Sequence, residues 1–401
     1  MKKKRGFKKT ENSIFLAAIV VIFLFGLLTL IKTEKTISKT ENRTLTTFPH
    51  FTIKSFIDGS FQDNFESALS DQFIGSERIR VLYAKLIGNI PSFSLGESVC
   101  QNHYLELVNS VDRRRGTFNC EDYIVYYPEP LTDEQTEIVA NNLQIYNHIN
   151  KLTDAYYYFV NDSSVYNFET NQKLVDYDAI LKQNLTGNYH LASLNFDNYA
   201  AYKPYFYKTD HHWNNFGSYQ GYLAIHKLLN LSDQPLEPTS EQSNHETFFG
   251  SHARNTNNYD YQEEFNYYTF NLPPHSTVIN GLPATYGHYS DYINHNYVSE
   301  DVENTYAFFY GSDEGEIIYD FRQSQKDNLL IISNSYSNAV NELIASHYNK
   351  TFIIDLRRYK TIFGQDFKLE EYLEKNHINK TLLLISPTFI RDTSTHQGLE
   401  P

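Results

Sequence analysis

Cysteine is scarce in this chain of 401 residues, where only Cys100 and Cys120 are present. A metal centre built on cysteine thiolates needs more ligands than these two supply, so the scarcity excludes such a centre. In an oxidising compartment the two cysteines can form a disulfide, closing a loop of about 20 residues and stabilising the fold by about 3 kcal/mol. They can equally remain two partly buried thiols, and the sequence leaves both interpretations open.

Basic charge is also in short supply. The chain carries 34 Lys and Arg against 48 Asp and Glu, which gives a formal net charge of −14 at pH 7. A nucleic-acid-binding protein needs a basic face, so this balance argues against that class. The first nine positions hold a cluster of basic residues: Lys2, Lys3, Lys4, Arg5, Lys8 and Lys9. A hydrophobic content of 41% favours a folded globular body over a disordered chain.

Long apolar runs are nearly absent, because only residues 14–31 are apolar enough to span a membrane. At about 1.5 Å per residue this run extends roughly 27 Å, close to the thickness of a hydrocarbon core. A cleaved signal peptide is the alternative, but its apolar region usually has about 7–15 residues and ends at small residues. No such site follows here, so residues 14–31 are predicted to be an uncleaved transmembrane anchor.

The charge around this anchor predicts its orientation. Basic flanks stay on the cytoplasmic side, so residues 1–13 are expected to be cytoplasmic. A polar stalk at residues 32–47 would then lead to an extracytoplasmic domain at residues 48–401. The chain is therefore predicted to be a single-pass protein of the cell membrane with its main domain outside.

The first half of the outer domain shows helical periodicity in two places. Apolar residues recur at helical spacing between 60 and 86, which predicts one or two amphipathic helices. Residues 88–130 carry several breaks and are expected to be rich in hairpins. A helix is predicted from Thr132 to Leu152 because acidic residues occupy its first turn, and a strand follows at 156–160. A helix followed by a strand is the start of an α/β pattern.

The carboxyl-terminal part alternates more regularly. Strands are expected at 329–332, 351–355 and 381–385, and helices at 338–348 and 369–376. Short all-apolar strands separated by helices predict an α/β fold with a parallel sheet flanked by helices on both faces.

The middle of the chain is less regular. Residues 161–207 are expected to form loops and a short helix at 177–183, and a helix is predicted at 216–229. Residues 231–325 are polar and weakly periodic, so they are interpreted as a probable insertion whose strands cannot be ordered. No internal repeat is visible.

A serine-rich turn follows the strand predicted at 329–332. Ligands collect at the carboxyl ends of parallel strands, which is where Ser333, Ser335 and Ser337 fall. Backbone N–H groups at the start of the following helix could stabilise a developing oxyanion. A serine nucleophile also needs an adjacent base, and a Ser/Asn turn is common as a simple helix cap. The turn alone therefore supports either interpretation.

A possible base lies upstream, where Asp210 and His212 are two residues apart. In an extended segment both side chains share one face, so the carboxylate can hold one ring nitrogen and leave the other as a base. His211 would then point the other way. A satisfied polar loop and a metal site are the alternatives, but no third zinc ligand stands at a typical spacing. No metal and no cofactor are expected.

The chain resembles the DHHW family of bacterial membrane-anchored proteins, whose four name-giving residues stand here as Asp210-His211-His212-Trp213. That family is similar in turn to the SGNH-hydrolase-like domains of alginate O-acetylation proteins, in which an Asp-x-His motif precedes a Gly-Asp-Ser turn. The likeness also includes Glu41-Asn42-Arg43 with Pro49, Asp71-Gln72-Phe73, Phe249-Gly250-Ser251, the Ser335 turn and Ile354-Asp355-Leu356-Arg357.

The resemblance implies roles for individual residues. Asp210 would orient the ring of His212, which would act as base, and Ser335 would attack as nucleophile. Substrate-binding roles fall to Trp213, Asn334 and Tyr336, with Trp213 shaping the pocket. The chain departs from the family pattern at the turn, because Ser333-Asn334-Ser335 stands in place of Gly-Asp-Ser, which restricts the turn and its access to the oxyanion position.

The expected function is that of a serine esterase or O-acetyltransferase acting on a cell-envelope polysaccharide. An integral membrane acyltransferase is the possible partner that the resemblance implies as acyl supplier. The altered turn motivates a different alternative, a non-catalytic carbohydrate-binding or assembly protein with the same fold. A metal-dependent hydrolase that uses Asp210 and both histidines is a third hypothesis, which predicts loss of activity with a chelator.

Overall fold

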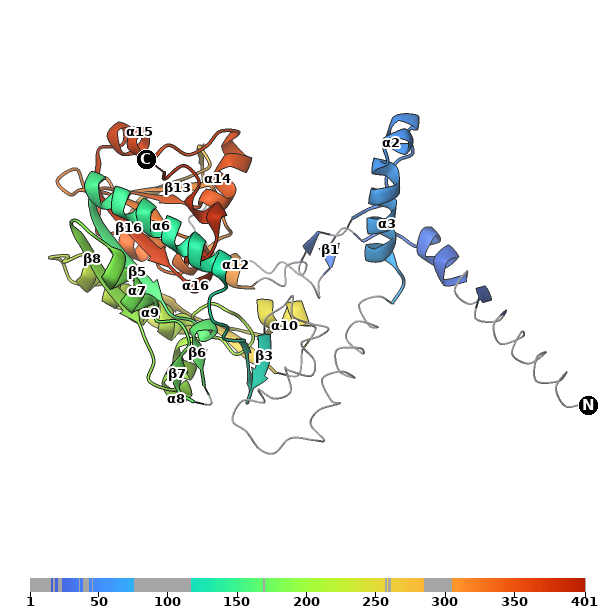
Figure 1. The fold of residues 1–401 in the computed structure, drawn as a ribbon, viewed down its shortest axis with the longest axis horizontal. Helices are drawn as coiled ribbons and strands as arrows, with labels where there is room; N and C mark the ends of the chain where they lie inside the picture. Colours follow the sequence, from blue (N-terminus) through green and yellow to red (C-terminus); the bar gives the residue numbers. More distant parts are fainter. Residues whose placement is uncertain are drawn as a thin grey trace, which may run out of the picture. The chain divides into compact units, whose positions relative to one another are not determined.

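The computed structural model describes residues 16, 19–20, 24–35, 37–38, 43–44, 46–75, 117–168, 170–256, 258, 261–284 and 305–400. The chain divides into two compact units, Met1–Phe93 and Ser94–Pro401 (Figure 1). Cys120 is disulfide-bonded, while Cys100 lies outside the described residues.

The first unit contains short strands and helices. Residues 24–31 are helical, and they are followed by β1 (Ile37–Ser38), β2 (Arg43–Thr44), α2 (Ile53–Ile57) and α3 (Ser60–Gln72). Among the described residues, no helix combines the length and the apolarity that crossing a membrane requires. The predicted anchor at 14–31 is only partly described, and the helical prediction beyond residue 75 lies outside the described residues.

Two polar residues at the end of α3 hold the preceding segment in place. Gln72 is completely buried; its side chain accepts a hydrogen bond from Lys35 N at 3.0 Å and donates to Lys35 O at 2.8 Å and Thr46 O at 3.1 Å. Asp71 accepts from Thr46 N at 2.8 Å. Buried amide groups are costly unless bonded, so this pair fixes the chain around residues 35 and 46 against α3.

The second unit is a mixed α/β structure built on one sheet of eight strands, in the order β12-β11-β13-β15-β14-β16-β5-β8. The five strands from β15 to β8 are parallel to one another. The parallel strands are β5 (Asp154–Val160), β8 (Tyr189–Leu194), β14 (Asn328–Ile332), β15 (Lys350–Ile354) and β16 (Ile378–Ile385). Each of β5, β14, β15 and β16 has a buried apolar run, as strands covered on both faces require.

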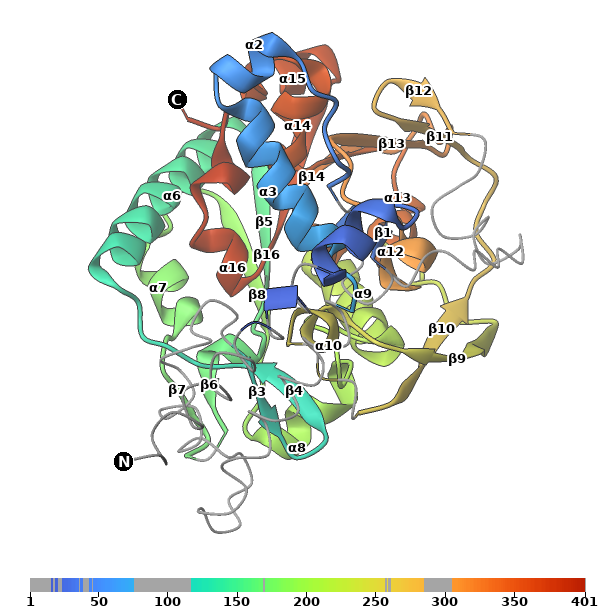
Figure 2. The ribbon, with the colours of Figure 1, turned by 90° about the vertical axis from the view of Figure 1, so that its right-hand side faces the viewer.

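Helices lie on both sides of this sheet. Figure 2 shows α6 (Asp133–Leu152) on one side of the sheet and α9 (Asn215–Leu228) on the other. Helices α15 (Leu369–Lys375) and α16 (Pro387–Ile390) contact β16 and α6 respectively, and α13 (Asn341–Ala345) contacts both α9 and β15. Thr132 caps α6 with a capping box, which explains why the helix starts where the sequence predicts.

The remaining elements include β11, β12 and β13, which complete one edge of the sheet, and others that surround it. They are β3 (Thr117–Cys120), β4 (Tyr123–Tyr126), η2 (Ser163–Val165), β6 (Tyr166–Asn167), β7 (Gln172–Lys173), α7 (Tyr177–Asn184), α8 (Tyr199–Tyr202), η3 (Lys203–Tyr205), β9 (Ser240–Phe248), α10 (Ser251–Thr256), β10 (Glu263–Thr269), β11 (Ser276–Ile279), β12 (Leu282–Pro283), α12 (Thr305–Tyr310), β13 (Glu316–Asp320), η4 (Ser335–Ser337), α14 (Leu356–Phe363) and η5 (Thr393–His396).

The structure departs from the sequence-based topology at three places. The sheet is mixed, because β13 runs antiparallel to β15 and carries β11 and β12 beyond it. All three strands come from the stretch 231–325, where no order could be predicted. Strand β8 lies within the predicted loops at 161–207, and the helix predicted at 338–348 is only the short α13 preceded by η4. Long-range pairing decides these cases, and local periodicity does not report it.

Candidate active site

The segment around the Asp-His-His-Trp motif is a turn. Phe206 and Trp213 form an antiparallel bridge, and Tyr207 N donates to His212 O at 3.3 Å. The expectation of an extended segment at Asp210 is therefore wrong. So is the expectation that His211 points away, because the rings of His211 and His212 lie 3.8 Å apart.

Asp210 holds His212 by two hydrogen bonds to one carboxylate oxygen. Its Oδ1 lies 2.6 Å from His212 Nδ1 and accepts from His212 N at 2.9 Å, as an aspartate commonly does two residues ahead in a turn. Its Oδ2 accepts from Ser251 N at 2.6 Å. Burial alone would raise the pKa of Asp210, but the imidazoles of His212 and His211 hold it well below its usual value. The carboxylate is therefore ionised and fixed in position.

Ser335 meets the other nitrogen of the same ring. Its Oγ lies 2.8 Å from His212 Nε2, although the two residues are 123 positions apart in the chain. Ser335 opens η4 directly beyond the carboxyl end of β14, and it is partly exposed while Asp210 and His212 are buried. The three side chains thus form a continuous Asp–His–Ser hydrogen-bonded series that ends at the partly exposed Ser335.

The backbone N–H groups of the serine turn are mostly engaged. Tyr336 N donates to the side-chain oxygen of Asn334 at 3.2 Å, and Ser337 N donates to Asn334 O at 3.1 Å. Ser335 occupies the first helical position, where an N–H has no acceptor within the helix. Of the three N–H groups at the start of η4, the one on Ser335 is therefore the one that could donate to an oxyanion.

The residues assigned to substrate binding are all buried. Trp213 has no exposed surface and fits against Gly221, where an added Cβ would meet its ring at 2.4 Å. Tyr336 donates to His211 O at 2.6 Å, and Asn334 Nδ2 donates to Ser386 Oγ at 3.3 Å. These contacts fix the three side chains in the core next to the Asp–His–Ser series. The substrate-binding roles of the three residues stay predictions.

Tyr306 is a neighbour of the site that the sequence did not indicate. Its ring stacks on His212 with centroids 3.8 Å apart and an interplanar angle of 7°. Its hydroxyl donates to Ser335 O at 3.3 Å. Tyr306 therefore contacts both His212 and Ser335, but it lies in the stretch 231–325, where no motif marked it.

Phe249-Gly250-Ser251 belongs to the resemblance without a stated role, and the structure gives it one. Besides the Ser251 N–H on Asp210, Ser251 Oγ lies 2.6 Å from His211 Nδ1, and Gly250 N donates to Thr209 Oγ1 at 2.9 Å. A Cβ at residue 250 would lie 2.3 Å from Asp210 Cβ and 2.5 Å from Thr209 O, distances that real Cβ contacts do not reach. Glycine is required here by close approach.

This close approach predicts the effect of Gly250→Ala. The added methyl must push the backbone at 209–210 away and displace the Asp210 carboxylate from His212. A misplacement of about 1 Å costs on the order of 100-fold in rate, so we expect covalent labelling of Ser335 by a sulfonyl fluoride to slow by that amount. Gly315→Ala is the control, because its nearest contacts are at 3.2 Å, and it should label at the wild-type rate.

Glu263 forms hydrogen bonds with the two residues that precede the Asp-His-His-Trp motif. At the start of β10 its carboxylate accepts from Lys208 N, Thr209 N and Thr209 Oγ1 at 2.8, 2.8 and 2.7 Å. Burial raises its pKa from 4.5 to about 7, although these hydrogen bonds act to lower it. A carboxyl group that titrates near neutrality therefore holds the two residues that precede Asp210.

The raised pKa of Glu263 predicts a pH-dependent stability. Between pH 4.5 and 7 the folded chain retains a proton that the unfolded chain releases, so the free energy of unfolding falls as pH rises through this window. This difference in pKa between the folded and unfolded chain corresponds to about 3 kcal/mol in the free energy of unfolding. Urea unfolding from pH 4.5 to 8 should show a shallower decline in Glu263→Gln, while Glu264→Gln should keep the wild-type slope. Equal slopes in all three proteins would contradict the role of Glu263.

Asp210, His211 and His212 also offer donor atoms within 4.8 Å of one another, close enough to approach a common metal ion. In this structure the ring nitrogens face Asp210, Ser335 and Ser251. An ion here would have to replace those hydrogen bonds, so the residues fit a proton-transfer series better than a metal centre.

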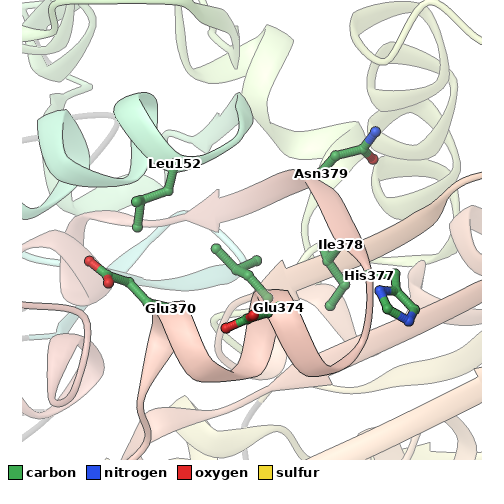
Figure 3. A pocket seen from close by; sticks show the side chains of 7 residues that line it. Leu152, Glu370, Glu374, His377, Ile378 and Asn379 are labelled. Carbon is green, nitrogen blue, oxygen red and sulfur yellow. The ribbon is translucent and has the colours of Figure 1, made fainter.

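A separate pocket lies at the amino ends of the parallel strands, opposite to the end that carries Ser335. It has a volume of about 480 Å³ and lies around the end of α15 and the start of β16, as Figure 3 shows. Its lining residues are Leu152, Glu370, Leu373, Glu374, His377, Ile378 and Asn379. The Asp–His–Ser series lies beyond the carboxyl end of β14, so this pocket at the amino end of a parallel neighbour is not part of it.

No family model matches the sequence, and no curated protein matches it. Among solved structures, Bacillus cereus PatB1 is similar, with a TM-score of 0.52 and 17% identity over 70% of this chain and 98% of that chain. A DHHW family protein from Eubacterium siraeum DSM 15702 has a TM-score of 0.52 and 15% identity, covering 71% of this chain and 95% of that chain. The O-acetyltransferase domain of Pseudomonas putida AlgJ is more distant, with a TM-score of 0.39 and 10% identity over 70% and 95% of the two chains. The predicted resemblance is confirmed as a likeness of fold: this chain is similar in fold to a DHHW family protein and to PatB1.

Proposed function

We propose that this chain is a serine-dependent O-acetyltransferase or esterase that acts on a cell-envelope polysaccharide. The observation that carries the proposal is the contact of 2.8 Å between Ser335 Oγ and His212 Nε2, with Asp210 on the other ring nitrogen at 2.6 Å. A nucleophile, a base and an orienting acid in this order activate a serine for acyl transfer. A structure of Bacillus cereus PatB1 carries a sulfonyl adduct, which supports the choice of reagent in the tests below.

The first half of the reaction acylates Ser335. Its Oγ forms a bond to the carbonyl carbon of the donor ester while its proton passes to His212 Nε2. Asp210 stabilises the imidazolium, and the N–H of Ser335 donates to the oxygen that becomes negative. When the tetrahedral intermediate collapses, the bond to the donor oxygen breaks and His212 returns the proton to the leaving group.

The second half releases the acyl group. A sugar hydroxyl gives its proton to His212 as it attacks the acyl-Ser335 carbonyl, and the second tetrahedral intermediate expels Ser335 Oγ, which takes the proton back. Water in place of the sugar gives hydrolysis by the same steps. Transferase and esterase therefore share every catalytic group and differ in the acceptor that reaches the acyl-enzyme.

The proposed location follows from the amino end of the chain. We propose that residues 14–31 anchor the protein in the cell membrane and that the second unit lies outside. An integral membrane acyltransferase would then supply the acyl group from the cytoplasmic side. The basic residues of positions 1–13 and the single apolar run support this orientation.

A single assay tests the proposed activity. The purified chain is given p-nitrophenyl acetate, and release of p-nitrophenol is followed with and without cell-wall oligosaccharides. We expect turnover, an acetyl group on Ser335 by mass spectrometry, and acetylated sugar in the presence of the correct acceptor. Turnover without acetylated sugar for any acceptor supports the esterase. No acyl-enzyme and no turnover, together with retained polysaccharide binding, would favour the non-catalytic alternative.

A further inference from the structure

A second cluster of titratable groups lies away from the Asp–His–Ser series, where α9 ends. His226 stands in the last turn of α9, Asp233 in the loop that follows it, and His347 between α13 and β15. One donor atom from each residue lies within 4.8 Å of the others. The mechanism proposed above uses none of the three. Since a helix rises 1.5 Å per residue, His226 lies roughly 16 Å along α9 from the end that carries the Asp-His-His-Trp motif.

The two imidazoles present ring nitrogens that make no hydrogen bond. His226 Nε2 and His347 Nδ1 are both buried without a hydrogen-bond partner, and the two residues are 9% and 5% exposed. His347 Nδ1 lies 3.0 Å from Asp233 Oδ2 and His226 Nε2 lies 4.0 Å from Asp233 Oδ1, but neither has hydrogen-bond geometry. Asp233 is thus a charge partner for both rings, but buried polar atoms that lack a well-formed hydrogen bond are costly, so two of them facing one carboxylate require a reason.

The surroundings suit a metal ion. The other nitrogen of His347, Nε2, lies 2.7 Å from the hydroxyl of Tyr222, which fixes the ring as supporting contacts do for ligating histidines. The Asp233 side chain is 41% exposed, which gives an ion and a water ligand access from solvent.

We propose that His226, Asp233 and His347 bind one divalent transition-metal ion of the zinc class. His226 Nε2, His347 Nδ1 and one carboxylate oxygen are the three protein ligands, and water is the fourth. Zinc with bonds of about 2.0–2.1 Å places tetrahedral ligands about 3.4 Å apart, so binding draws the outermost donors together by roughly 1 Å. The ion would link the carboxyl end of α9 to the connection between α13 and β15. The proposed base, His212, lies just before α9, and the proposed nucleophile, Ser335, lies shortly before α13.

Lys326 makes the proposal sharper because it competes for the same carboxylate. Its Nζ donates to Asp233 Oδ2 at 2.8 Å. An ammonium group here reduces the charge that Asp233 can offer an ion. Removing it should therefore strengthen metal binding, although it removes an ion pair from the fold.

The test uses the full chain, purified without a histidine tag and stripped with EDTA. Zinc chloride is titrated against a chromogenic zinc indicator, and the melting temperature is followed with and without zinc. We expect one equivalent to bind and, at about 100 times the dissociation constant, to raise the melting temperature by roughly 5 °C. His347→Gln and Asp233→Asn should weaken binding at least tenfold, and Lys326→Met should tighten it.

Matched controls separate this site from others. His190→Gln removes a histidine outside both clusters, whose Nε2 lies 3.3 Å from the Asp154 carboxylate and whose ring stacks on Tyr156, and this variant should bind zinc as wild type does. His211→Gln probes the Asp210 cluster and should also leave binding unchanged. Absence of a bound equivalent overturns the proposal, and so does an equivalent that is lost in His211→Gln but kept in His347→Gln and Asp233→Asn.

Discussion

Ser335→Ala should abolish covalent labelling by a serine-directed sulfonyl fluoride and lower any acyl-transfer rate by at least about 10⁴-fold. The hydroxyl that it removes is the one within 2.8 Å of His212 Nε2, and no other serine of the turn has a base beside it. Mass spectrometry of the labelled protein identifies the modified residue, and initial rates with an activated acetate ester measure the loss.

The neighbouring serines are matched controls for this variant. Ser333 Oγ donates to Leu384 O at 3.1 Å and Ser337 Oγ donates to Asn334 O at 3.2 Å, and both residues are buried. Ser333→Ala and Ser337→Ala should therefore keep the label and cost at most a few kcal/mol of stability. If Ser335→Ala labels as fast as wild type, Ser335 is not the nucleophile.

Asp210→Asn should lower the acyl-transfer rate on the order of 10⁴-fold while leaving the fold intact. An asparagine has the same shape, but its Oδ1 carries no full charge to stabilise the imidazolium. In the wild type, Ser251 N donates a hydrogen bond to Asp210 Oδ2 at 2.6 Å, and in the variant it would face the donor Nδ2 instead. The pH dependence of the residual rate and the melting temperature should be recorded together.

The outcome of Asp210→Asn discriminates between two roles for this residue. If Asp210 only supported the turn, stability would fall and the rate would follow the folded fraction. We expect a rate loss that persists where circular dichroism shows a fully folded chain. Asp162→Asn is a useful comparison, because Asp162 is also buried near the site, with Oδ2 3.4 Å from the Tyr336 hydroxyl, but makes no hydrogen bond to His212. It should affect stability more than rate.

Local patterns were sufficient for the parts of the site that follow chain order. A buried apolar strand that ends in serines predicts a nucleophile at the edge of a sheet, and β14 with Ser335 has that arrangement. The Asp-x-His spacing likewise indicated that the side chains of Asp210 and His212 meet. They do so in a turn, in which the backbone N–H of His212 donates a hydrogen bond to Asp210 Oδ1.

Long-range contacts were beyond such patterns. Tyr306 and Glu263 reach the site because the β9–β10 hairpin and α12 share a second apolar cluster, made of Tyr207, Phe248, Phe265, Tyr306, Tyr310 and Ala339. Neither residue stands in a motif, and their positions depend on packing between distant segments. The antiparallel edge of β11, β12 and β13 escaped prediction for the same reason, since these strands are short and have no continuous buried run.

The order of strands has a consequence for synthesis of the chain. β5 is completed early, yet its neighbour on one side is β16, the last strand in the part of the chain that the structure describes, and β16 also joins β5 to β14. A nascent chain that already contains all three residues of the Asp–His–Ser series therefore still lacks the strand that links its two halves. Premature termination after residue 337 should yield an inert product, because the site becomes competent only once β16 has been made.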